Sequence, residues 1–209
     1  MGISERKERE KEDLRKSILD AAREVFLEKG YEQTSIRNIA EKIEYSPTTI
    51  YLYYKDKDAI FHALHSEGFC MMNEKMDVLR FVADPFERLI AMGRIYIDFA
   101  MKNQGLYDLM FIEKAPIDCI ESNQETWLEG QNTFGGLTHT INECIQKGYF
   151  PKQDPEVASY VIWSTVHGMC SLQISNRCNK VISDANKDDI IEKGFQSFVL
   201  LLNAMRINQ

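Results

Sequence analysis

The sequence contains few residues of the kinds that interrupt helices or make tight turns. Only 5 of its 209 residues are proline and 11 are glycine, which is few for an all-β protein with many turns. Apolar residues make up 44% of the chain, and they recur mostly three and four positions apart, as on one face of a helix. We therefore expect an all-α fold with a substantial core.

Further absences limit the compartment and the chemistry. No run approaches the length of a membrane span, and the first residues include no apolar signal segment. The five cysteines are scattered without a C-x-x-C pair, which favours a reducing, cytoplasmic location. No catalytic motif is recognisable, and the GQNTFGG stretch lacks the lysine of a phosphate-binding loop. We expect no enzymatic activity and no cofactor.

The sequence also offers no clear metal site. His167 and Cys170 lie three positions apart on an expected helix, but two ligands do not define a metal site, and no third or fourth ligand clusters with them. A packed core is the favoured interpretation of this pair, and we expect no bound metal.

Acidic residues are in excess, but they are unevenly distributed. The formal net charge is −7, whereas residues 1–57 contain 12 Lys or Arg and 12 Asp or Glu. The whole excess therefore lies in residues 58–209. A neutral amino-terminal part can still bind DNA if its cations face the phosphates.

Residues 34–57 predict two short helices joined by a tight turn. Thr34 or Ser35 can cap the first, whose apolar face is Ile36, Ile39, Ala40 and Ile43. Ser46 can cap the second, with Pro47 at its first position. Helices this short and this close in sequence must cross steeply, as in a helix-turn-helix. The alternative is an ordinary pair of amphipathic helices in a bundle.

The second of these helices, residues 47–54, has an unusual exposed composition. Its polar positions are Thr48, Thr49, Tyr51 and Tyr53, which carry hydroxyls but no charge, while Ile50 and Tyr54 can face the core. A solvated helix usually carries Lys and Glu instead. Hydroxyls and aromatic edges suit a surface that meets DNA bases and phosphates.

This run resembles the DNA-binding domain of the TetR family of transcriptional regulators. The matching residues are Gly30, Thr34-Ser35, Ile39-Ala40, Ser46, Thr49, Tyr51, Tyr53-Tyr54 and Lys57. The family usually has glycine and then an aliphatic residue in the turn, whereas this chain has Glu44-Tyr45. If the turn requires a left-handed residue, Glu44 carries about 1 kcal/mol of strain.

The resemblance implies a three-helix DNA-binding head in residues 1–56 and a helical bundle for ligand binding and dimerisation in residues 57–209, with about nine helices in all. It implies a ligand-responsive homodimeric regulator, most simply a repressor, that binds a palindromic operator. A helical bundle that binds a small molecule or a partner without any DNA function is the alternative.

Candidate residues follow for DNA binding. We expect base-edge contacts from Thr48, Thr49 and Tyr53, and phosphate contacts from Ser35, Arg37, Tyr51, Lys55 and Lys57, with Ser46 and Pro47 at the same surface. Residues 1–13 alternate in charge. They are either a solvated extension of the first helix or an arm that touches the DNA backbone through Arg6, Lys7 or Arg9.

Further candidates lie in the carboxy-terminal part. An effector pocket could draw on aromatic and histidine side chains, namely Tyr96, Phe99, Tyr107, Phe111, Trp127, Phe134, Trp163 and His167. For each of these, core packing is the alternative. Trp163 and His167 also match a W-x-x-x-H-G element of one TetR carboxy-terminal subclass. We expect Phe195, Phe198 and Leu202 on the last helix to form the dimer interface.

Overall fold

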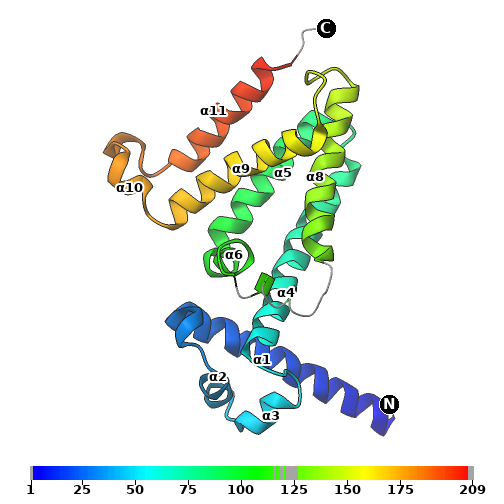
Figure 1. Cartoon of the computed structure of the whole chain (residues 1–209), viewed down its shortest axis with the longest axis vertical. Helices are drawn as coiled ribbons and strands as arrows, with labels where there is room; N and C mark the ends of the chain where they lie inside the picture. Colours follow the sequence, from blue (N-terminus) through cyan, green and yellow to red (C-terminus); the bar gives the residue numbers. More distant parts are fainter. Residues whose placement is uncertain (1, 115, 118–119, 121–126, 207–209) are drawn as a thin grey trace. The chain divides into compact units, whose positions relative to one another are not determined.

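The computed structural model describes residues 2–114, 116–117, 120 and 127–206. Every regular element within those ranges is a helix, so the all-α prediction is confirmed (Figure 1). The chain forms two compact units that interleave in sequence: Met1–Phe69 with Gly105–Trp127, and Cys70–Gln104 with Leu128–Gln209.

The first unit holds the predicted head. It contains α1 (Ile3–Gln33), α2 (Ile36–Lys42), α3 (Pro47–Tyr51) and most of α4 (Lys57–Asp77). Within α1 the backbone turns at Gly30, where φ is 76°, a positive value that glycine adopts without steric cost. Gly30 is predicted from the sequence to end the first helical stripe, and the backbone is indeed non-helical there, although α1 continues beyond it to Gln33.

Apolar residues from these four helices share one core. The side chains that are at most 3% exposed include Ile18, Ala22, Val25, Ile39, Ala40, Ile50, Ile60, Phe61 and Leu64. Phe26 and Tyr31 meet Phe61 edge-on, with ring centroids 5.4 and 4.8 Å apart. The helical spacing of these residues in the sequence is what places them on the buried faces.

A later segment, α6 (Gln104–Phe111), packs into the same unit through two glycines. A Cβ atom on Gly68 of α4 would lie 2.5 Å from Met110 Sδ. A Cβ atom on Gly105 would lie 1.8 Å from Leu27 Cδ2 on α1. Because neither glycine has a side chain, α6 can approach both α1 and α4 closely.

The second unit is built mainly from four long helices. These are α5 (Pro85–Lys102), α8 (Leu128–Gln146), α9 (Pro155–Ile174) and α11 (Ile190–Ala204), accompanied by η1 (Val78–Phe81), α10 (Cys178–Val181) and η2 (Asp184–Asn186). Their core includes Phe86, Leu89, Ile141, Cys144, Phe150, Ala158 and Leu202. Asp84-Pro85 and Asp154-Pro155 each predict a helix start. Both predictions are confirmed, since Asp84 and Asp154 each accept two backbone hydrogen bonds from the first turn.

Two details differ from the sequence-based expectation. Two adjacent glycines predict an interruption at Gly135-Gly136, and this prediction is wrong, because α8 runs through both residues without a break. Each glycine costs a helix roughly 1 kcal/mol relative to alanine, and the burial of Ile141 and the packing of Leu137 against the core outweigh that cost. The apolar positions between Ile60 and Leu79 predict a fourth helix that reaches about Arg80, but α4 ends at Asp77 and continues as the 3₁₀ turn η1.

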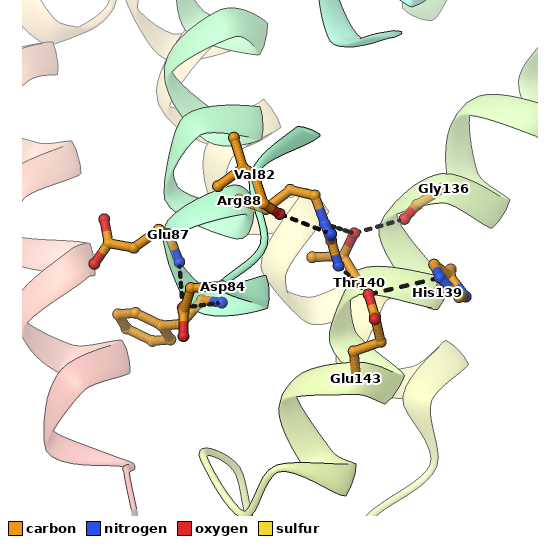
Figure 2. Close-up of polar contacts among 9 residues, drawn as sticks. Val82, Asp84, Glu87, Arg88, Gly136, His139, Thr140 and Glu143 are labelled. Carbon is orange, nitrogen blue, oxygen red and sulfur yellow. Dashed lines mark hydrogen bonds and ion pairs between the residues drawn. The ribbon is translucent and has the colours of Figure 1, made fainter. Parts of the chain in front are cut away.

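A partly buried arginine joins α5 to α8 (Figure 2). The Arg88 guanidinium donates to the Val82 carbonyl oxygen at 3.0 Å and to Thr140 Oγ1 at 3.3 Å, and it pairs with the Glu143 carboxylate. Thr140 in turn donates to the Gly136 carbonyl oxygen at 3.0 Å. These contacts satisfy the Arg88 charge, which is only 12% exposed, and fix the two helices to each other.

Within the described ranges, no helix combines the length and apolarity needed to cross a membrane. The four cysteines that the structure describes are free thiols, and Cys119 lies outside the described residues.

Candidate nucleic-acid interface

Two serines set the starts of the helix-turn-helix. Ser35 Oγ accepts a hydrogen bond from Asn38 N at 3.2 Å, and Ser46 Oγ accepts one from Thr49 N at 3.2 Å. Thr34, the other candidate cap for α2, is 2% exposed and donates to the Gly30 carbonyl oxygen at 2.8 Å. Ser35 is therefore the cap of α2, and Thr34 secures the end of α1.

The turn between α2 and α3 contains a left-handed residue at Glu44, one of the two positions where the sequence departs from the resemblance. Glu44 has a φ of 59°, and the next amide, Tyr45 N, donates to the Ala40 carbonyl oxygen at 3.0 Å. This bond closes the end of α2 in the manner of a left-handed cap. A glutamate in this conformation costs roughly 1 kcal/mol that a glycine would not.

The exposed face of α3 carries hydroxyls and no charge. Thr48 is exposed, Tyr51 is 56% exposed, and Thr49 and Tyr53 are half-buried. Thr49 Oγ1 lies 3.0 Å from Ser46 Oγ, so one hydroxyl pair also stiffens the first turn. These side chains lie on the outside of the unit, as a role in DNA contact requires.

The inward face of this segment is as predicted. Ile50 is fully buried and Tyr54 is 5% exposed. Burial of these two residues fixes the rotation of α3 about its axis. If α3 rotated so as to expose Ile50 and Tyr54, its polar face would have to enter the core. The outward direction of Thr48 and Tyr51 is therefore a consequence of the core.

Two large side chains at the same surface were not among the candidates predicted from the sequence. Leu52, at the end of α3, is 78% exposed, and Tyr45, in the turn, is 49% exposed. An exposed leucine beside a DNA-reading helix can contact thymine methyl groups. The signal was available in the sequence, because Leu52 lies two residues from both Ile50 and Tyr54, which face the core.

The cations near α3 fall into three groups. Arg37 and Lys55 are exposed and have no ion pair among the described residues. Lys42 is neutralised by Glu24 at 2.8 Å and Glu28 at 3.4 Å. The third group is Lys57 alone, whose ammonium is hydrogen-bonded to the Tyr31 carbonyl oxygen within the head. Arg37 and Lys55 thus remain available for phosphate contacts.

Lys57 ties the start of α4 to the end of α1. Its Nζ donates to the Tyr31 carbonyl oxygen at 3.0 Å and lies 3.9 Å from the Tyr31 ring centroid. The Tyr31 hydroxyl donates to the Asp58 carboxylate, and burial together with this carboxylate raises the pKa of Tyr31. An ammonium has three donors, so Lys57 can keep this bond and still reach a phosphate.

The predicted pocket residues fall into two groups, one in each unit. In the second unit, the Tyr96 hydroxyl lies 2.9 Å from His167 Nδ1, and Trp163 Nε1 donates to the same hydroxyl at 3.4 Å. Phe134 meets Trp163 edge-on at 6.1 Å, and Phe99 is 1% exposed. Burial lowers the pKa of His167, because it disfavours the charged ring.

The remaining three pocket candidates belong to the first unit. Phe111 lies 5.1 Å from Tyr107 and 5.4 Å from Phe69, and Trp127 lies 5.3 Å from Phe69, between ring centroids. Tyr107 is fully buried. The structure therefore brings together two aromatic clusters in place of the single set of eight that the sequence suggested. A role in effector binding stays a prediction for both.

The predicted dimer residues require a correction. Phe195 is 2% exposed, Leu202 is 5% exposed, and Phe198 packs against the core of the second unit. All three therefore stabilise the subunit itself, because the helix turns them inward. The apolar side chains that α9 and α11 leave exposed by 55% to 69% are others: Val157, Tyr160, Val161, Leu200 and Leu201.

Metal binding finds no support among the side chains that the structure describes, which include no group of three or more potential ligands. Cys170 is fully buried, and burial raises the pKa of its thiol to about 12. A thiol in this state is a poor ligand and a poor nucleophile.

Comparison with known proteins agrees with this geometry. Residues 18–64 match the family of bacterial regulatory proteins named for TetR, and residues 89–198 match the tetracyclin repressor-like carboxy-terminal domain. The HTH-type transcriptional regulator YvkB of Bacillus subtilis is 42% identical over 145 residues, which cover 65% of this chain and 76% of that protein. The HTH-type transcriptional repressor AcnR of Corynebacterium diphtheriae is 37% identical over 151 residues, which cover 66% and 80%.

Solved structures agree as well. The fatty acid degradation regulator FadR from Bacillus halodurans superposes with a TM-score of 0.72 at 21% identity, over 93% of this chain and 97% of that one. At 21% identity, this similarity is evidence for the fold alone.

Proposed function

The chain belongs to the TetR family of bacterial regulatory proteins, and we propose that it is a repressor that binds a near-palindromic operator as a homodimer and leaves it when a small-molecule effector binds. It is a transcriptional regulator with a helix-turn-helix DNA-binding domain. The observation that carries the finer proposal is the uncharged, hydroxyl-bearing face of α3 beside Arg37 and Lys55, which form no ion pair with any residue that the structure describes. Its place of action is the cytoplasm, where its DNA target lies.

In this proposal α3 enters the major groove. Thr48, Thr49 and Tyr53 contact base edges, and a threonine can serve either as a hydrogen-bonding group or as a methyl contact. Arg37, Lys55 and the Tyr51 hydroxyl contact phosphates and fix the orientation of the head. Lys57 adds a phosphate contact while it holds Tyr31.

Dimerisation uses the side chains that α9 and α11 leave exposed. Val157, Tyr160, Val161 and Leu201 give two neighbouring helices an apolar outer surface. A two-fold axis pairs such a surface with itself. The two heads then read half-sites spaced by about one helical turn of DNA, or a multiple of it.

Effector binding belongs to residues 57–209 in this proposal. The Tyr96, Trp163 and His167 group supplies hydrogen-bonding atoms among aromatic rings, the mixture typical of small-molecule sites. An effector releases the operator only if it binds the non-binding conformation more tightly than the DNA-binding one. That differential affinity is the coupling free energy between the two sites.

The test is binding to the DNA upstream of the chain's own gene, measured by fluorescence anisotropy against a scrambled duplex of equal length. Wild-type protein should prefer the upstream duplex. Thr48→Ala should reduce that preference by about 1 kcal/mol, roughly fivefold, because it removes one base contact. Thr138→Ala, a threonine of α8 in the second unit, is the control and should leave the preference unchanged.

Two outcomes would count against the proposal. Equal binding of wild-type protein to both duplexes at all salt concentrations would show that the protein does not recognise a specific DNA sequence. A complete absence of duplex binding would favour the alternative, a helical bundle that binds a small molecule or partner without DNA function.

A further inference from the structure

The first turns of α1 form a helical arm that makes little contact with the head. Every residue from 4 to 13 is exposed, and Leu14 is the first half-buried residue. In Figure 1 these turns, in dark blue, run on past α3 within the same unit. Because these side chains are exposed, the arm offers a surface that a partner can contact. An isolated helix of this length is only marginally stable in water, so such a contact would also stabilise the arm.

The charges on this arm are sorted by helix face. At about 100° per residue, Lys7 and Lys11 fall on the same stripe as Leu14 and Ile18. Ile18 is fully buried in the head, so this stripe marks the side of α1 that faces the core of the head. The stripe therefore changes from apolar to basic where it leaves the head.

Arg15 connects this stripe to the end of the reading helix. Its guanidinium carbon lies 5.3 Å from the Tyr54 ring centroid, and Tyr54 follows directly after Tyr53 and before the exposed Lys55. The basic stripe thus starts beside the residues that are proposed to contact DNA. Lys7 and Lys11 extend it outward by about 12 Å from Arg15, at 1.5 Å per residue.

The lysines on the stripe carry uncompensated charge. Neither Lys7 nor Lys11 forms an ion pair among the described residues. Arg6, on another face, pairs with Glu10 at 2.8 Å. Glu5, Glu8 and Glu12 share a separate stripe, since they are spaced by three and four residues. No acidic residue of the arm lies on the stripe itself, and Glu8 and Glu10 flank it on either side.

We propose that the arm is a second DNA-contacting element, in which Lys7 and Lys11 bind backbone phosphates next to the half-site that α3 reads. This proposal rests on the proposed DNA-binding function and adds a contact that carries no sequence information. Phosphate contacts release condensed counterions, so they contribute affinity that decreases steeply with salt. Each lysine in contact adds about 0.9 to the slope of log K against log salt.

The experiment compares salt slopes for wild-type protein, Lys7→Gln/Lys11→Gln and Arg9→Gln/Lys16→Gln on the upstream duplex. Both double variants remove two positive charges from α1. Arg9 was a candidate arm contact from the sequence, but it lies with Lys16 on the face opposite the stripe, so the proposed arm contact does not include it. We expect the Lys7/Lys11 variant to lose about 2 from the slope per subunit, with an unchanged preference for the upstream over the scrambled duplex. We expect the control variant to keep a slope close to that of wild type.

Two results would overturn the arm contact. Equal slopes for the two variants would mean that the arm acts only through net charge. An unchanged slope for Lys7→Gln/Lys11→Gln, while the upstream duplex is still preferred, would reject the arm and leave the proposed function intact. Failure of the wild-type protein to bind any duplex would reject both.

Discussion

At the scale of single residues, short polar side chains at helix starts decide much of the local structure. Asp84 Oδ1 accepts from Phe86 N at 2.9 Å and from Glu87 N at 3.0 Å, as Figure 2 shows. The Tyr149 hydroxyl donates to Asp84 Oδ2 at 2.7 Å. Burial acts to raise the pKa of Asp84, but these three hydrogen bonds to its charged form outweigh it and lower the pKa.

Asp84→Ala should therefore destabilise the protein in a pH-dependent way. At pH 7 we expect a loss of about 1 kcal/mol in the free energy of unfolding, the usual contribution of a helix cap. Because the folded-state pKa is lowered, this contribution is present above the unfolded-state pKa of about 4 and disappears as the pH falls through the folded value. Urea unfolding of both proteins between pH 7 and pH 3 measures the difference.

The difference between wild type and Asp84→Ala should narrow below about pH 4. Asp154→Ala, at the start of α9, is a useful companion, since Asp154 caps its helix without the tyrosine bond. A constant difference across the whole pH range would show that the Asp84 charge contributes nothing to stability.

These caps could be predicted from the sequence because they depend on neighbouring residues alone. Ser46-Pro47 and Asp84-Pro85 start helices wherever they occur before an apolar stripe. The left-handed Glu44 was likewise foreseen from the turn. Burial on α11 could not be predicted in the same way, since Leu201 and Leu202 are chemically identical. Only the packing of α11 on its neighbours decides that Leu202 is buried and Leu201 is not.

At the scale of elements, glycines distinguish close helix contacts from open helix faces. Gly93 of α5 faces a buried ring, since a Cβ atom there would lie 2.6 Å from Phe195 Cε2. Gly136 of α8 is exposed and has no atom within 4 Å of such a Cβ position. The same residue type therefore serves packing in one helix and has no packing role in the other.

Substitution by alanine should separate the two cases. Gly136→Ala should increase the free energy of unfolding by about 1 kcal/mol, because alanine favours the helix and meets nothing. Gly93→Ala gains the same propensity but displaces Phe195, and overpacking of a core costs about 1–3 kcal/mol. For Gly93→Ala we therefore expect the free energy of unfolding to stay the same or to decrease.

Thermal and urea unfolding of Gly93→Ala, Gly136→Ala and wild type give the comparison. Equal stabilisation by both alanines would show that Phe195 moves aside freely and that the α5–α11 contact is loose.

The long helices could be predicted because each combines a start signal with a sustained apolar stripe. The helices against which each of them packs could not be predicted from the sequence. Periodicity shows that Phe111 and Trp163 lie on apolar faces, but it does not show that they belong to different compact units. The continuity of α8 through Gly135-Gly136 was also missed, because local helix propensity was outweighed by tertiary packing that the sequence does not display.

At the scale of the whole molecule, α11 presents one side to its own subunit and another to solvent. Leu202 is 5% exposed and Leu201 is 65% exposed. If the exposed side forms the dimer, Val161→Glu/Leu201→Glu should give a monomer that keeps its helical circular dichroism. A buried charge at a self-complementary surface has no partner, which makes association unfavourable.

Leu202→Ala is the matched control. It should lower the free energy of unfolding by about 2–5 kcal/mol, as core truncations do, without a direct effect on association. Sedimentation velocity at several protein concentrations, with circular dichroism on the same samples, distinguishes the two variants. A double glutamate variant that remains dimeric would move the interface away from α9 and α11.

The interleaving of the two units also constrains how the protein can be divided. α6 contacts Leu27 through Gly105 and meets Gly68 through Met110, yet thirty-odd residues separate it in sequence from the rest of its unit. A fragment that stops at Phe69 would leave the surfaces beneath α6 uncovered. Chimeric regulators that exchange reading heads between relatives would therefore need a discontinuous graft, in which the donor supplies α6 together with α1 to α4.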